Sequence, residues 1–210
     1  MRPPKHFREA QTDPPPEAYS RVSDPERFRP LHARALDLLQ TLRREYDVRA
    51  EASFELLPWM SSFEHARDPV TLTPARPTAA PLAVAFTPFP GLLVRFGRWQ
   101  EDRFPSCGCD ACRETAEGEG ERFENLVRDV VAGHFREELE IPRLREPRLS
   151  WWLGESGASP HGHSSGSRTL SVPHADLLGK AGAGEVRWQA WPRRVRRVAG
   201  MLDETERSRE

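Results

Sequence analysis

The spacing of apolar side chains changes from a helical to a strand period near residue 47. Before this point, apolar residues recur every three or four positions, which predicts an amphipathic helix over residues 25–46. Ser23 and Glu26 have the spacing of a capping box with Pro25 in the first turn, so we expect the helix to begin there. After the change, apolar and polar residues alternate over 48–56, the pattern of a half-buried strand.

The pattern of apolar residues in the rest of the chain predicts short strands and one further long helix. Strands are expected at 69–73, 82–87 and 92–99, at 149–153, and at 186–190. A second helix is expected over 111–139, ended by Pro142 and Pro147, and a third could start at Pro192. Two helices that bracket runs of strands, without regular alternation, predict an α+β fold. We expect a mostly antiparallel sheet with two main helices packed on one face.

The domain organisation follows from where prolines and charges gather. Residues 1–20 are polar and rich in proline, which predicts a disordered N-terminal arm. Residues 21–202 are expected to form a single α+β domain, and 203–210 a charged tail. The Gly, Ser and His residues of 154–168 are typical of a mobile connector.

Composition excludes several classes of protein. No apolar run approaches the roughly 20 residues of a membrane span, and no secretory signal is visible, so we expect a soluble, cytoplasmic protein. A net charge of -1 argues against nucleic acid as a partner and leaves a protein partner open. Trp188, Trp191 and the arginines after them could stack on bases, but acidic residues on both sides favour a solvated helix face.

All three cysteines lie within six residues, at Cys107, Cys109 and Cys112. Thiolates at such spacing can hold one zinc ion with Zn–S bonds of about 2.3 Å, so the segment predicts a structural zinc site. Three thiolates leave one position of a tetrahedral site open, and we prefer His161 or His163 as the fourth ligand. His134 is too distant, because the 22 positions from Cys112 would span roughly 33 Å of continuous helix.

Two other interpretations of the cysteines stay open. Cys109 and Cys112 form a C-x-x-C pair at the expected start of a helix, where the dipole lowers a thiol pKa, as in a thiol redox protein. Alternatively, the thiols bind nothing, and the chain is a protein-interaction module of a regulatory or immunity type. The order of residues shows no catalytic arrangement, so the sequence favours a protein that is not an enzyme.

Several stretches together resemble an actinobacterial family, a domain of unknown function. They include Thr87-Pro-Phe-Pro-Gly91, Phe104-Pro-Ser-Cys-Gly-Cys-Asp-Ala-Cys112 and Trp191-Pro-Arg-Arg194, and the likeness runs from residue 14 to 194. The three-cysteine segment is its most specific part. The resemblance implies a single bacterial domain, and it brings no activity, cofactor or catalytic residue with it.

Overall fold

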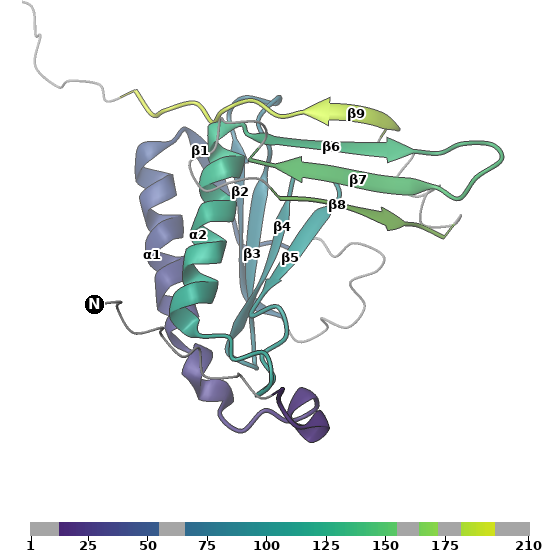
Figure 1. Ribbon diagram of the computed structural model, residues 1–210. Coiled ribbons are helices and arrows are strands. Elements are labelled where there is room, and N and C mark those ends of the chain that lie inside the picture. The colour runs from purple at the N-terminus through teal and green to yellow at the C-terminus, as the bar shows by residue number, and fades with distance from the viewer. Residues whose placement is uncertain (1–12, 55–65, 155–163, 172–181, 196–210) are drawn as a thin grey trace, which may run out of the picture.

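The computed structural model describes residues 13–54, 66–154, 164–171 and 182–195 of the chain (Figure 1). The described helices are the 3-10 helices η1 (Pro16–Tyr19) and η2 (Pro25–Phe28) and the α-helices α1 (Pro30–Glu45) and α2 (Ala116–Ala132). The described strands are β1 (Val48–Glu51), β2 (Arg67–Pro74), β3 (Leu82–Thr87), β4 (Gly91–Phe96), β5 (Gln100–Phe104), β6 (Phe135–Glu140), β7 (Arg148–Leu153), β8 (Ser164–Thr169) and β9 (Gly184–Arg187).

The strands form two antiparallel sheets. Five strands pair in the order β1-β2-β3-β4-β5, and four pair in the order β8-β7-β6-β9. In Figure 1, α1 and α2 lie side by side over one face of the five-stranded sheet, and the four-stranded sheet extends away from the C-terminal end of α2. The α+β class, the antiparallel pairing and the two main helices are therefore confirmed, with the strands divided between two sheets.

The main hydrophobic core lies between the helices and the five-stranded sheet. Alternate side chains of β3 and β4, such as Val84 and Val94, are fully buried there, as the period of a strand requires. Leu31 and Ala35 of α1 and Phe123 of α2 enter the same core from one face of each helix. Because three apolar surfaces meet in it, this core holds both helices in register with the sheet.

The first helix begins later than the capping box predicted. Residues 25–28 form η2, and α1 starts only at Pro30. Ser23 does not cap a helix: its hydroxyl donates to Asp110 Oδ2 at 2.6 Å and its backbone N–H to Oδ1 at 2.9 Å. The prediction was wrong because a carboxylate distant in sequence satisfies Ser23 better than the local turn could.

The second helix is shorter at both ends than the expected 111–139. Thr115 caps α2 by accepting a hydrogen bond from the Gly118 N–H at 3.1 Å. Gly133, at φ 78°, ends the helix in the left-handed conformation, and the chain continues as β6. The helical spacing of Phe135 was coincidental, because Phe135 and Leu139 instead alternate as inward-facing residues of a strand.

Three further expectations differ from the structure at the chain ends and in the polar connector. Residues 16–20 of the expected disordered arm include η1, while residues 1–12 lie outside the described residues. The expected connector at 154–168 contributes β8, which pairs with β7. Pro192 starts no helix within the described residues, since Arg193 forms an isolated antiparallel bridge with Tyr46; residues beyond 195 are not described. No helix in the described part of the chain could span a membrane.

Candidate metal centre

The three cysteines converge in the loop between β5 and α2. Their Sγ atoms all lie within 4.8 Å of one another, and those of Cys109 and Cys112 are 3.4 Å apart. Two thiolates bound to one tetrahedral zinc ion lie about 3.8 Å apart, as bonds of about 2.3 Å require. Cys109 is buried, whereas Cys107 and Cys112 are exposed. The three sulfur atoms could therefore hold one metal ion.

The backbone around Cys107 bends sharply, which brings the flanking sulfur atoms together. Gly108 has φ 80°, and a Cβ there would lie 2.8 Å from the Phe89 ring. Glu114 Oε2 accepts the N–H groups of Cys107 at 3.1 Å and of Gly108 at 2.6 Å. A glycine at this position and a carboxylate that receives two amides thus hold the loop in shape.

The thiols affect one another's ionisation. Hydrogen bonds from the Cys107 thiol and from the backbone N–H groups of Cys112 and Ala111 lower the pKa of Cys109. The pKa of Cys112 is raised to about 12, first by its hydrogen bond with Cys109 and then by that with Cys107. Without a cation, a second thiolate in the cluster is therefore unfavourable, and a bound metal ion would offset that charge.

The cysteine loop is fastened to the N-terminal segment, residues 13–29. Asp110 accepts hydrogen bonds from the hydroxyl and the N–H of Ser23 and from Arg21 Nε at 3.0 Å. These bonds, the Ser23 hydroxyl first, lower the pKa of Asp110 to about 2. Arg27 donates to the Gly108 carbonyl at 2.8 Å, and the Asp110 N–H to the Arg21 carbonyl at 2.9 Å. Side-chain and backbone hydrogen bonds therefore join the loop to the N-terminal segment.

The structure bears differently on the three histidines weighed as a fourth ligand. His161 and His163 lie outside the described residues, so their role as fourth ligand stays a prediction. His134 follows the C-terminal end of α2, with Nδ1 3.5 Å from Asp129 Oδ1, whereas Cys112 precedes the N-terminal end. The Gly154 N–H donates to the His134 carbonyl at 2.8 Å, so the described start of the His161 segment is also near that far end. Among the described residues, no fourth Cys, His, Asp or Glu joins the cluster.

The structure does not place the C-x-x-C pair at the start of a helix, where a redox pair would gain from the dipole. Cys109 and Cys112 lie in the loop before α2, which begins at Ala116. The hydroxyl of Thr115 already accepts a first-turn N–H of this helix. The lowering of the Cys109 pKa therefore comes from neighbouring thiols and local amides, and the three thiols are not joined by a disulfide.

Sequence reasoning missed Asp110 and Glu114 as partners of the loop and of the N-terminal segment. The Asp110 carboxylate accepts from Ser23 of the N-terminal segment. The signal available for Glu114 was a carboxylate two residues after the last cysteine, close enough to reach back to the amides of the turn. Nothing local in the sequence pairs Asp110 with residues near 23.

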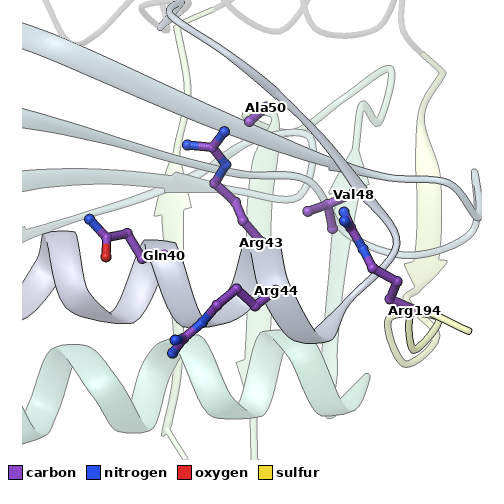
Figure 2. A pocket seen from close by; sticks show the side chains of 6 residues that line it. All are labelled: Gln40, Arg43, Arg44, Val48, Ala50 and Arg194. Carbon is purple, nitrogen blue, oxygen red and sulfur yellow. The ribbon is translucent and has the colours of Figure 1, made fainter. Parts of the chain in front are cut away.

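A second candidate is an arginine-lined hollow of about 490 Å³ between the end of α1 and β1 (Figure 2). Arg43, Arg44 and Arg194 line it, but in Figure 2 Arg44 extends in the opposite direction from Arg43. Arg44 Nη2 donates to Thr41 Oγ1 at 3.1 Å, and the neighbouring Arg193 pairs with Glu45 at 2.5 Å. The guanidinium groups do not meet at a common point, so the hollow is a weaker candidate than the cysteine cluster.

Comparisons with known proteins place the chain in a family. Searches among curated proteins and among solved structures each found no match. A family model described as a family of unknown function, DUF6226, matches residues 3–195. This match covers nearly the whole chain, including the three cysteines, and confirms the resemblance to a domain of unknown function. The chain therefore belongs to the DUF6226 family.

Proposed function

We propose that Cys107, Cys109 and Cys112 bind one zinc ion and that this ion has a structural role. The observation that supports the proposal best is the convergence of three sulfur atoms within 4.8 Å of one another. Thiolates are soft ligands that select zinc over magnesium and calcium, and a small core gains stability from a bound ion. The fourth ligand in this proposal is His161 or His163.

The structural role follows from what the loop contacts. Asp110, between two of the cysteines, receives three hydrogen bonds from Ser23 and Arg21. A zinc ion would keep the loop in the shape that presents this carboxylate to the N-terminal segment. Metal binding and docking of the segment are then coupled, because the free energy of binding stabilises only the folded loop.

Native mass spectrometry of the full chain, purified without chelator, tests the metal. We expect one zinc ion per chain, lost in C107S and retained in S106A, a serine beside the cysteines that supplies no sulfur. The variants H161A and H163A test the fourth ligand, with H134A as control, since the His134 side chain contacts Asp129. Zinc content that is unchanged in C107S would refute the site.

Limited trypsin digestion tests the structural role. Removal of zinc with a chelator should speed cleavage after Arg21 and Arg27, because both side chains contact the cysteine loop in the folded protein. The same acceleration is expected for C107S without chelator, whereas S106A should behave like wild type. A metal that binds but leaves the cleavage rate unchanged would contradict a structural role.

A second candidate function is thiol exchange by Cys109 and Cys112, favoured by the 3.4 Å between their sulfur atoms. In this case the protein holds no metal, and mild oxidation lowers its mass by about two hydrogens as the disulfide forms. A chain that neither binds zinc nor forms this disulfide would instead be a metal-free interaction module. The mass measurement thus separates all three candidates.

A further inference from the structure

A cleft of about 370 Å³ lies where the two sheets meet α2. Its walls come from the start of β5, from the middle of α2 and from the β7–β8 pair, and none of its lining residues belongs to the cysteine loop. Phe96, Leu126, Trp151 and Leu153 supply an apolar lining. The volume is at the small end of the range for ligand sites, so the cleft suits a single ring.

Two buried polar side chains line this cleft, and one of them has an atom without a hydrogen-bond partner among the described residues. Gln100 is 5% exposed, and its Nε2 has no hydrogen-bond partner among the described residues. The side chain of Asp129 is 8% exposed, and among the described residues its carboxylate contacts His134 Nδ1 at a long 3.5 Å. A buried donor without a partner is costly, so the Gln100 amide favours a ligand that supplies an acceptor, and the Asp129 carboxylate has lone pairs that can accept a further hydrogen bond.

Four charged residues of the cleft form two ion pairs. Glu101 lies 3.3 Å from Arg168, which joins β5 to β8, and Asp102 lies 2.7 Å from Arg122 of α2. These two ion pairs cancel, which leaves the carboxylate of Asp129 as the excess charge. The cleft therefore favours a neutral or cationic ligand and disfavours a phosphate or a carboxylate.

The indole ring of Trp151 forms one wall of the cleft, and its contact with β8 fixes its position. It packs on Gly166 of β8, where an added Cβ would lie 2.9 Å from the ring. A glycine at that position thus allows the aromatic ring to lie close to the strand. Flat aromatic rings beside hydrogen-bonding side chains suit ligands that have an apolar face and polar edges.

We propose that this cleft binds a hydroxylated ring of monosaccharide size, either neutral or carrying one amino group. A hydroxyl group can accept from Gln100 Nε2, and a hydroxyl or ammonium group can donate to Asp129. The C–H face of such a ring packs against Trp151 and Leu126. This proposal is independent of the zinc site, because it uses none of the cysteines.

Titration of the ¹⁵N-labelled full chain with glucosamine, glucose and glucuronate tests the proposal by NMR. Saturable shifts are expected at the side-chain amide of Gln100 and the indole N–H of Trp151. Glucosamine should bind most tightly and glucuronate most weakly, because of the carboxylate of Asp129. In D129N, affinity for glucosamine should fall about tenfold, toward that for glucose, since the acceptor of the ammonium group loses its charge.

A second variant separates binding from folding. Q100M keeps the size of the side chain and removes the unpaired amide, so it should raise Tm by a few degrees while weakening both sugars severalfold. Q40M, an exposed glutamine outside the cleft, is the control and should change neither property. The proposal is overturned by absent or unsaturable shifts, by glucuronate binding best, or by a lower Tm in Q100M.

Discussion

Glu137 connects the two sheets by a carboxylate that is fully removed from solvent. Its Oε1 accepts the N–H of Arg98 at 2.7 Å and the indole N–H of Trp188 at 2.9 Å. Its Oε2 accepts the N–H of Trp99 at 3.1 Å. Because Arg98 and Trp99 belong to the turn between β4 and β5, one side chain of β6 links the five-stranded sheet to the other.

The ionisation of Glu137 makes the stability of the fold depend on pH. Burial raises the pKa of this carboxyl from 4.5 to about 7, and the N–H groups of Arg98, Trp188 and Trp99 limit the rise. The folded state thus binds a proton at Glu137 more tightly than the unfolded state does. The stability that this proton contributes to the fold is complete below about pH 4 and is lost as the pH rises through 7. A shift of this size corresponds to about 3 kcal/mol, of which about 2–3 kcal/mol falls between about pH 5 and pH 8.

The substitution E137Q isolates this contribution. Urea unfolding should show that the free energy of unfolding of wild type falls by about 2–3 kcal/mol more than that of E137Q over this pH range. At low pH the variant should be the less stable protein, because its amide N–H₂ would face the Trp99 N–H and one hydrogen bond is lost. E140Q, which removes an exposed charge from the same strand, is the control. Parallel pH profiles for wild type and E137Q would refute the reasoning.

Two further predictions concern Gly133 and Asp110. G133A should lower the free energy of unfolding by at least about 2 kcal/mol, because φ is 78° and the new Cβ would lie 2.4 Å from the Ala190 nitrogen. G118A, in the first turn of α2, should change it by less than about 1 kcal/mol in the same urea titration; equal effects would contradict the argument. D110A should speed trypsin cleavage in the N-terminal segment, while D37A, on the exposed side of α1, should not; an unchanged rate in D110A would show that its hydrogen bonds do not hold the segment.

Elements with a regular apolar period were predictable from the sequence. The interiors of α1 and α2 and the strands β2, β3 and β4 lie within or close to their expected ranges, because each buries one stripe or one face. The polar strand β8 was missed, since Ser164 to Thr169 carry no apolar pattern and pair only because β7 lies beside them. The burial of Glu137 was missed for a related reason. A glutamate in an acidic run is expected to be solvated, and the three N–H groups that donate to Glu137 come from distant parts of the chain.

The sequence by itself determined the two helices, most of the strands and the clustering of three thiols within six residues. These features depend on neighbours a few positions apart, so their period and spacing carry the information. Only the tertiary structure decided that Ser23 binds Asp110 and that two sheets share Glu137. The partners in these contacts are separated by 87 and 39 residues, and folding of the intervening chain is what makes one available to the other.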